Sequence, residues 1–511
     1  MQTRILQVLI VFTFSLALIS GCGGKKDTVE ETETVSVQPV NDGEPDFHDD
    51  EVFEKASEPS IDLKEIKERG ELRVVVDNSS TSYFIYKGRR MGFEYELLQR
   101  LSEALGLDLK IKVTENIEEA FELLEDGTAD LLAYHLTVTL ARRDRFDFTT
   151  PHTQIRQVLV QRKPQNWRKM KLHVIEKTLI RDVGELGGKE IHVRKGSAFA
   201  DRLNNLSEEI GEEINVVEVE DASSEFLIEQ VLNGEIAYTV ADEDLARINK
   251  SYHPDLDVEL AVSFPQRIAW AIRKESPELK KAVNDEIAKL KKTADFQTIY
   301  DRYFKYAKSQ RKRSQSEYSS NSGGGISPYD ELIKKESQRI EWDWRLLAAQ
   351  IYQESKFDPK TVSWAGAEGL MQLTKNTQKE YGLKQPFNPT ANIEAGVSHL
   401  LWLEKYWVDE ITDPDELKKF ILASYNTGHG HVSDARRLAK RYGDDPNVWY
   451  GSVEKYLLLK SNPKYYKDPV VRFGYCKGIE PTNYVKEILE RYEEYQNFFE
   501  PDKTSEEITS L

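Results

Sequence analysis

The chain has 511 residues and a formal net charge of −18. A chain of this length is expected to form about two or three domains. The excess of negative charge argues against a nucleic-acid partner, because binding to phosphate groups requires a basic surface.

The first 22 residues have the pattern of a cleaved signal peptide. Arg4 precedes an apolar core over residues 5–19, which is shorter than the roughly 20 residues of a membrane-spanning helix. The segment Ile19-Ser20-Gly21-Cys22 is similar to a bacterial lipobox, in which Cys22 becomes the acylated N-terminus. The alternative is an ordinary N-terminal anchor helix, which would keep this peptide.

Gly23 follows Cys22 at the position where an Asp would favour retention in the inner membrane. By analogy with sorted lipoproteins of Gram-negative bacteria, we expect a lipid anchor in the outer membrane with the protein on the periplasmic face. No later apolar run reaches the length of a membrane span, so we expect the remaining chain to be water-soluble.

The second cysteine, Cys476, has no partner for an intramolecular disulfide once Cys22 is acylated. No histidine is near it in the sequence, so a small buried residue is a better interpretation than a nucleophile.

We predict no metal site and no cofactor.

Residues 27–54 contain eleven acidic residues and no Lys or Arg. Such a segment repels itself and cannot bury enough apolar surface to become ordered. We therefore expect residues 23–60 to form a disordered tether.

Short β-branched runs alternate with helical patterns from residue 61 onward, which predicts parallel α/β sheets with ligands at the carboxyl ends of the strands. Two such sets follow one another, so we expect two lobes with a cleft between them. The predicted strands are 72–76, 109–113, 129–133, 190–193, 214–219 and 237–240, and the predicted helices are 93–105, 117–124, 199–206 and 224–233.

Residues 61–306 resemble the type 2 periplasmic solute-binding proteins of the amino-acid-binding kind. The resemblance implies that Arg142 binds a ligand α-carboxylate, for which the guanidinium fork is well suited. It implies that Ser197 opens a helix whose free N–H groups face an anion, and that Asp242 binds the ligand ammonium. The matching motifs are Gly92-Phe93-Glu94, Thr137-Val138-Thr139-Leu140-Ala141-Arg142, Phe146-Asp147-Phe148-Thr149-Thr150-Pro151 and Lys195-Gly196-Ser197.

Two departures from this family leave alternatives open. Leu140 and Ala141 replace a common Pro and acid, and Arg142 is crowded by Arg143 and Arg145, so a structural role for Arg142 remains an alternative. A spacer domain with an empty cleft is another. Our hypothesis is that a muropeptide or an amino acid binds in the cleft and regulates the following domain.

Residues 307–327 are rich in Ser, Gly and basic residues, which predicts a flexible linker and a domain boundary. Helical periodicity then continues over residues 328–500, where β-branched runs are scarce, and residues 501–511 form a tail. This last domain is dense in aromatic residues. Aromatic faces suit sugar rings, but we expect most of these residues to belong to the core.

Glu354 is out of place in the helix predicted over residues 344–355. Asp343 is a good N-cap, and Leu347 and Ile351 lie on the same face as Glu354. A carboxylate among apolar neighbours loses hydration, so its pKa rises and it suits a general acid. The alternative is a Glu that points to solvent at the end of the helix.

Four motifs in this domain, in one order, resemble the soluble-lytic-transglycosylase family, which implies an α-helical lysozyme-like fold. The motifs are Glu354-Ser355, the run from Ser363 to Gln372, Ser424-Tyr425-Asn426-Thr427-Gly428 and Glu480 followed by Tyr484-Val485. The resemblance implies a peptidoglycan substrate and no metal.

By this resemblance, Glu354 protonates the glycosidic oxygen and then, as a carboxylate, deprotonates the 6-hydroxyl of N-acetylmuramic acid. Tyr484 would hold the Glu354 side of the site. The subsite around the scissile bond would be lined by Ser363, Gln372, Tyr425 and Asn426. Alternatively, Gln372 satisfies backbone groups of the Gly-rich turn, and Asn426 belongs only to a helix-ending turn.

The sequence therefore predicts a lytic transglycosylase with an N-terminal binding domain. A muramidase would need a second carboxylate about 5–9 Å away, and Asp358 and Glu368, which are close in sequence, have no role in the family. A further alternative is a sensory or transport lipoprotein whose C-terminal domain binds peptidoglycan without cleaving it.

Overall fold

The structure is a computed structural model that describes residues 61–499 except 221, 307–311, 314–315 and 323. The predicted signal peptide with Cys22, the tether over residues 23–60 and the tail over residues 501–511 lie outside the described residues. Within the part that is described, no helix is both long and apolar enough to cross a bilayer.

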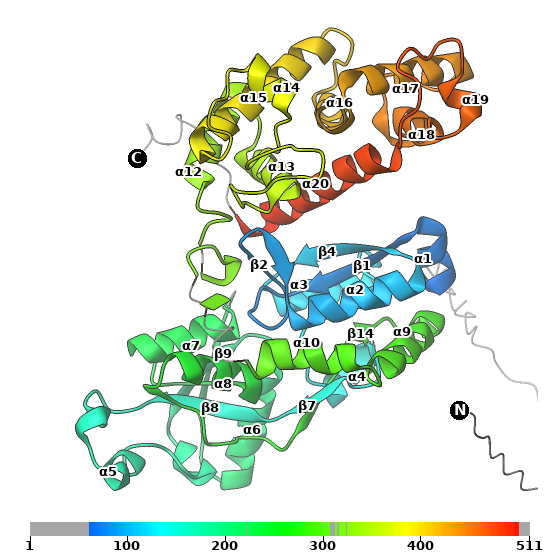
Figure 1. The fold of residues 1–511 in the computed structure, drawn as a ribbon. Helices are drawn as coiled ribbons and strands as arrows, with labels where there is room; N and C mark the ends of the chain where they lie inside the picture. The colour runs from blue at the N-terminus through cyan, green and yellow to red at the C-terminus, as the bar shows by residue number, and fades with distance from the viewer. Residues whose placement is uncertain (1–60, 221, 307–311, 314–315, 323, 500–511) are drawn as a thin grey trace, which may run out of the picture. The chain divides into compact units, whose positions relative to one another are not determined.

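The first lobe is built on a five-stranded sheet with the order β4-β1-β5-β14-β6. Strand β1 is parallel to β4 and β5, whereas β14 is antiparallel to β5 and β6. Helix α2 packs against α9 and α10 beside this sheet (Figure 1). The elements are α1 (Leu63–Arg69), β1 (Glu71–Val76), β2 (Phe84–Tyr86), β3 (Arg89–Met91), α2 (Phe93–Leu105), β4 (Asp108–Val113), α3 (Ile117–Glu125), β5 (Leu131–Leu132), α4 (Leu140–Arg145), β6 (Asp147–Phe148), β14 (Ala271–Ile272), α9 (Pro277–Leu290) and α10 (Ala294–Phe304).

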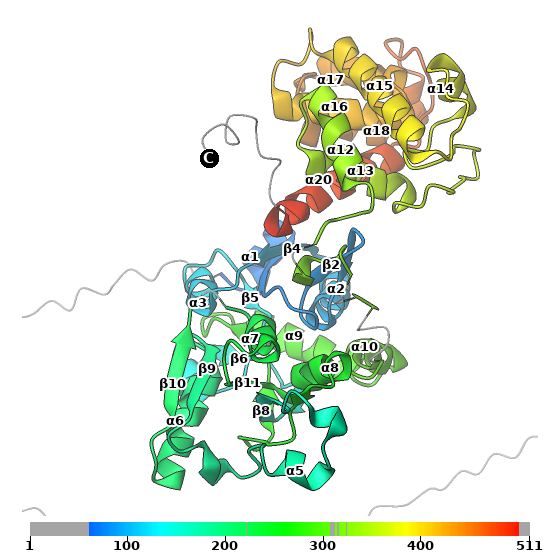
Figure 2. The same cartoon turned by 90° about the vertical axis from the view of Figure 1, so that its left-hand side faces the viewer.

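The second lobe has its own five-stranded sheet with the order β10-β9-β11-β8-β12. Strand β9 is parallel to β10 and β11, and β8 is antiparallel to β11 and β12; the first four strands lie side by side in Figure 2. The elements are β8 (Gln157–Arg162), α5 (Leu172–Glu176), β9 (Glu190–Arg194), α6 (Ala198–Ile210), β10 (Asn215–Val219), α7 (Ser224–Asn233), β11 (Tyr238–Asp242), α8 (Glu243–Tyr252) and β12 (Leu256–Asp257).

The chain crosses between the two lobes through an antiparallel ribbon of β7 (Thr153–Ile155) and β13 (Gln266–Ile268). Strand β7 leads from the first sheet into the second, and β13 leads back. The predicted two-lobed α/β domain is confirmed. The predicted strand 129–133 is shorter in the structure, where β5 has two residues.

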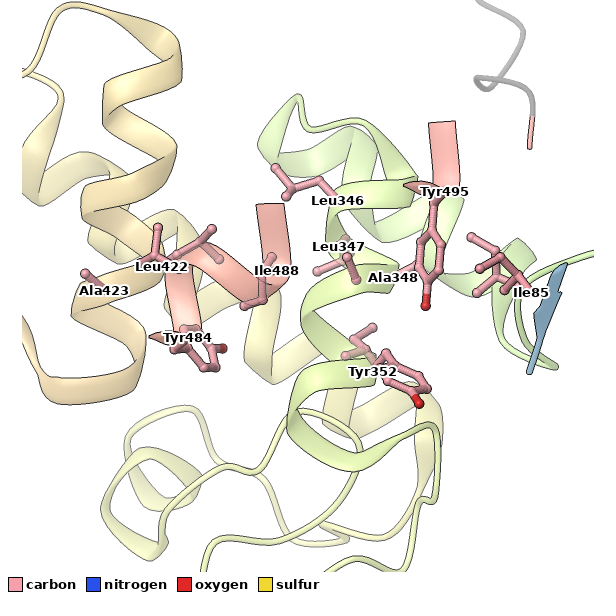
Figure 3. Close-up of a cluster of buried hydrophobic side chains, with 14 of the residues drawn as sticks. Ile85, Leu346, Leu347, Ala348, Tyr352, Leu422, Ala423, Tyr484, Ile488 and Tyr495 are labelled. Carbon is pink, nitrogen blue, oxygen red and sulfur yellow. The ribbon is translucent and has the colours of Figure 1, made fainter. Parts of the chain in front are cut away.

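The helices that follow form the predicted α-helical domain. Helix α20 (red in Figure 1) packs against α13 and α16, and Figure 3 shows buried side chains of these three helices in one cluster that includes Tyr484. The helices are α12 (Asp330–Ser337), α13 (Trp344–Ser355), α14 (Lys375–Glu380), α15 (Pro389–Trp407), α16 (Pro414–Thr427), α17 (His429–Tyr442), α18 (Glu454–Leu459), α19 (Pro463–Tyr466) and α20 (Ile479–Phe498).

Residues 316–320, which are a described part of the predicted linker, lie along strand β2. The Lys87 backbone N–H donates to the Tyr318 carbonyl oxygen (2.8 Å), and the Ile85 N–H donates to Ser320 Oγ (3.0 Å). The edge of β2 supplies hydrogen-bonding groups that hold the Ser-rich segment in place, and composition alone does not reveal such a partner.

Candidate functional site

Helix α13 places Glu354 at its last turn. Asp343 caps the helix as predicted, because its carboxylate accepts a hydrogen bond from the Arg345 N–H (2.9 Å). The helix ends at Lys356 and Phe357, which both have left-handed φ values of 52° and 62°. Two successive non-glycine residues in this region force a sharp turn directly after the Glu354 position.

The Glu354 carboxylate is partly buried and has one hydroxyl donor. Tyr484 of α20 donates its O–H to Glu354 Oε1 (2.5 Å), and Gln350 donates to the Tyr484 oxygen (3.3 Å). Leu347 and Ile351 on the same helical face are fully buried. Burial raises the pKa of Glu354 to about 7, although the hydrogen bond from Tyr484 lowers it. A proton can therefore leave and return near neutral pH, and this environment differs from that of a solvent-facing Glu.

The segment after α13 folds back toward the end of this helix. The Gln372 side-chain amide donates to the carbonyl oxygens of Thr361 (3.0 Å) and Gly369 (2.8 Å), and Thr361 Oγ1 donates to the Ser355 carbonyl oxygen (3.4 Å). Gln372 itself has a left-handed φ of 47°. Its amide nitrogen thus satisfies backbone groups, as the structural alternative for Gln372 predicts.

Gly369 is required in this segment for two reasons. Its φ is 81°, and a Cβ added to it would lie 2.2 Å from both the Pro386 carbonyl oxygen and the side chain of Asn392. Asn392 also accepts the Met371 N–H (2.8 Å). Helix α15 therefore fixes the course of the segment that carries Gln372.

Ser363 and Asn426 have different surroundings. Ser363 Oγ accepts the Ala367 N–H (3.0 Å), so this hydroxyl shapes the turn at residues 363–367. Asn426 is exposed on the last turn of α16, next to Tyr425. Neither residue is joined to Glu354 by a hydrogen bond between described residues.

Tyr425 joins α16 to the returning segment. Its hydroxyl donates to the Met371 carbonyl oxygen (2.8 Å). Burial and the charge of Glu354 raise the pKa of Tyr425. The structure thus joins Tyr484 to Glu354 by a hydrogen bond, and it joins Tyr425 to Met371, the residue before Gln372.

A row of aromatic side chains, not predicted from the sequence, continues from Tyr425. The ring of His399 lies 5.4 Å from that of Tyr425 and stacks on Trp402 at 5.9 Å. Trp402 stacks on Tyr406 at 5.9 Å, and His429 lies 4.6 Å from Tyr406. Trp402 and Tyr406 are 39% and 41% exposed, so this row of rings reaches the surface. Residues 399, 402 and 406 are three and four positions apart on one helix, so this spacing could have predicted that their side chains are neighbours.

The two acids near Glu354 in sequence are engaged elsewhere. Glu368 pairs with Lys375 (2.6 Å) and accepts a hydrogen bond from Gln378 (3.1 Å). Asp358 accepts the Lys360 N–H (2.9 Å). Both carboxylates stabilise the returning segment, which leaves Glu354 as the acid with a raised pKa here.

A second candidate site is a cavity of about 70 Å³ that Arg142, Ser197 and Asp242 all line. Arg142 donates to the carbonyl oxygens of Thr137 (2.8 Å) and Gly196 (3.0 Å), which belong to different lobes. Burial lowers the pKa of Arg142 to about 10. Ser197 Oγ and Asp242 Oδ1 are buried and have no hydrogen-bond partner among the described residues. The structure thus brings the three predicted residues to one cavity.

Carboxylates predominate in this cavity, and only one of them was predicted from the sequence. Asp77, Glu225 and Asp244 join Asp242, whereas the cationic side chains of the lining are Arg142, Arg194 and His135. Burial raises the pKa of Glu225 and of Asp242 to about 7. Asp77 and Asp244 follow the carboxyl ends of β1 and β11. Ligands of parallel α/β sheets bind at these ends, so the positions of the two acids in the sequence could have predicted them as lining residues. A ligand with a cationic group suits this lining.

Comparisons with known proteins match both parts of the chain. Residues 72–306 match the family model of bacterial extracellular solute-binding proteins, family 3, and residues 331–448 match that of the transglycosylase SLT domain. The chain is 35% identical to the membrane-bound lytic murein transglycosylase F of Desulfosudis oleivorans over 431 residues, which cover 84% of this chain and 91% of that protein. It is 33% identical to membrane-bound lytic murein transglycosylase F 1 of Alkalilimnicola ehrlichii over 447 residues, 87% of each chain. A solved structure of an ancestral arginine-binding protein bound to arginine has 22% identity and a TM-score of 0.40, and covers 46% of this chain and 99% of that one.

Proposed function

This chain belongs to the family of membrane-bound lytic murein transglycosylases F, and we propose that it cleaves the β-1,4 glycosidic bond between N-acetylmuramic acid and N-acetylglucosamine in peptidoglycan without hydrolysis. The products would carry 1,6-anhydro-N-acetylmuramic acid ends. The observation that supports this proposal most is the partly buried Glu354, with a pKa of about 7 and a hydrogen bond from Tyr484.

In the proposed mechanism Glu354 acts twice. Its protonated carboxyl donates to the glycosidic oxygen, so the N-acetylglucosamine side leaves as an alcohol. The resulting carboxylate then takes the proton of the 6-hydroxyl, whose oxygen bonds to the anomeric carbon and closes the anhydro ring. The substrate supplies the nucleophile, so the scheme requires no second carboxylate, in agreement with the engagement of Glu368 and Asp358 elsewhere.

We assign supporting roles to the residues around Glu354. Tyr484 orients the carboxylate and stabilises its charged form. Tyr425 and Gln372 line the subsite around the scissile bond, and Ser363 and Asn426 border it. In this assignment residues 328–500 form the catalytic domain and residues 61–306 the binding domain.

Replacement of Glu354 by Gln tests the reaction. We expect a loss of at least about 10²–10⁴-fold in product formation from purified sacculi, because the general acid is removed. Mass spectrometry of the products should show 1,6-anhydro ends with the unchanged chain and none with Glu354→Gln. The matched control, Glu368→Gln, should retain the anhydro products. Reducing ends would instead identify a hydrolase, and no products from the unchanged chain would favour a binding lipoprotein.

The contact between Tyr484 and Glu354 predicts a change in pH dependence. The hydroxyl stabilises the carboxylate, so Tyr484→Phe should raise the pKa of Glu354 above its value of about 7. Activity requires the protonated acid at the start, so the alkaline limb of kcat/KM should move upward by about one pH unit or more, given about 1.5–3 kcal/mol for a hydrogen bond to a charged group. Tyr492→Phe is the control on the same helix, since Tyr492 donates to Asp343 instead (3.1 Å). An unmoved limb in Tyr484→Phe would contradict the assigned role.

We further infer that the cleft between the two lobes binds a wall-derived peptide or an amino acid and thereby regulates cleavage. The cavity lining supports a ligand with a carboxylate for Arg142 and an ammonium group for Asp242. A ligand regulates only if it binds one arrangement of the protein more tightly than the other.

Binding measurements on variants of the full chain test this role. Arg142→Ala and Asp242→Asn should each weaken binding of a muropeptide about tenfold or more, because a charge-assisted hydrogen bond is lost. The same variants should abolish any effect of that peptide on cleavage. The exposed neighbour Arg143 supplies the control, Arg143→Ala. Equal binding by all of these variants would disprove the assignment of Arg142 and Asp242.

The relatives are named as membrane-bound proteins, which supports membrane association of this chain. We propose that residues 1–21 are removed, that Cys22 then carries the lipid anchor, and that the protein faces the periplasm from the outer membrane. Cells fed a fatty-acid probe should label the unchanged chain but not Cys22→Ser. A Cys22→Ser variant that stays labelled and membrane-bound would refute this anchor.

A further inference from the structure

Three side chains with metal-ligating atoms meet where the first lobe contacts the segments that cross between the lobes. Glu94 lies in the first turn of α2, His135 follows β5, and His152 directly precedes β7. Glu94 Oε1 lies 3.2 Å from His135 Nδ1 and 3.2 Å from His152 Nε2. All three ligand atoms lie within 4.8 Å of one another.

The distances between these ligand atoms can be compared with the distances between neighbouring ligand atoms around a bound metal ion. Zn²⁺ binds imidazole nitrogens and carboxylate oxygens at about 2.0–2.2 Å, usually with tetrahedral geometry, so neighbouring ligand atoms are roughly 3.3 Å apart. Two edges of the triangle have this length. We propose that Glu94, His135 and His152 form a binding site for one Zn²⁺ ion, a site that is separate from the catalytic carboxylate.

Burial supports a site rather than a chance surface cluster. Glu94 is 1% exposed and His152 is 3% exposed. A buried carboxylate needs a compensating positive charge, which a divalent ion can supply in place of a protonated histidine. Two imidazoles and one carboxylate are a ligand set that Zn²⁺ accepts with one position left open.

Outer contacts hold two of the three ligands as a metal site requires. Trp270 Nε1–H donates to the second oxygen of Glu94 (2.7 Å), which leaves Oε1 for the ion. His135 Nε2 lies 3.6 Å from Asp244 Oδ2, which is too long for a hydrogen bond, but the nitrogen opposite the ligating one faces a carboxylate. In metal sites this nitrogen commonly donates to such a carboxylate, a contact that a small movement of Asp244 would complete. The ring of His152 is held by packing, with its centroid 5.6 Å from Trp270 and 6.0 Å from Phe93.

The position of the site indicates how an ion would reach it and which parts of the chain the ion would join. His135 and Asp244 line the cavity between the lobes, so an ion can enter from the cavity and its open position would face that side. Asp244 lies in the first turn of α8 in the second lobe, whereas Glu94 belongs to the first. A bound ion would therefore tie α2 to the segment before β7 and, through His135 and its neighbour Asp244, connect it to the second lobe.

Without an ion, the same contacts would form a hydrogen-bond network in which Glu94 accepts from a charged histidine. The carboxylates of Asp244, Glu94 and Asp242 outweigh the burial that by itself lowers the pKa of His135, and they raise it to about 10. Measurements with the metal alone distinguish this network from a zinc site.

The test uses the full chain, stripped with EDTA and then titrated with ZnCl₂. We expect one Zn²⁺ per chain after gel filtration, by elemental analysis, and a rise in the unfolding midpoint with the Zn²⁺ concentration, as mass action requires. Co²⁺ in place of Zn²⁺ should produce the visible absorption of a tetrahedral site.

Four variants locate the ion. Glu94→Gln and His152→Gln should lower Zn²⁺ affinity by roughly 100-fold or more, and Asp244→Asn, which keeps all three ligands, by about 10–100-fold. His173→Gln removes an exposed histidine of α5 and should bind Zn²⁺ as the unchanged chain does. If Glu94→Gln and His152→Gln fail to fold, Asp244→Asn still tests the proposal. The proposal is overturned if the stripped chain binds no Zn²⁺, or if Asp244→Asn and His173→Gln bind it equally well.

Discussion

The helical domain depends on one constraint, namely that a carboxyl group must sit among apolar side chains with a single hydroxyl donor. Loss of hydration destabilises the charged form of Glu354, and the Tyr484 hydroxyl partly offsets this cost. The tyrosine itself needs a fixed position, which the packing of α20 on α13 and the hydrogen bond from Gln350 supply. Helix packing therefore sets the proton affinity of Glu354, and a shift of α20 would change it.

The two sites treat their carboxylates differently. Glu354 is a lone acid whose pKa is raised by burial. In the cavity between the lobes, several acids share the space with two guanidinium groups, so each carboxylate also responds to the charges of its neighbours. The first arrangement suits proton transfer to a neutral sugar, whereas the second suits the selection of a charged ligand.

Local patterns predicted the elements well, because caps and periodicity act within a few residues. Helix α13 and its Asp343 cap, and helix α2, have the expected bounds. The sequence could also place Glu354 on an apolar face. It could not show that the Gln372 amide is occupied by backbone carbonyls, since its partners depend on how the Gly-rich segment closes. Contacts between distant elements, such as His399 with Tyr425 or His135 with Glu94, left no periodic signal.

The contact of residues 316–320 with strand β2 has a consequence for the behaviour of the protein at high density. Strand β2 pairs with β3 on one side. Its other side would be an edge with free backbone groups if residues 318–320 did not cover it. Such an edge is a template for pairing with another chain and so for aggregation. Tyr318 and Ser320 occupy donors of this edge. The segment that joins the domains thereby also protects neighbouring copies from associating through their sheets.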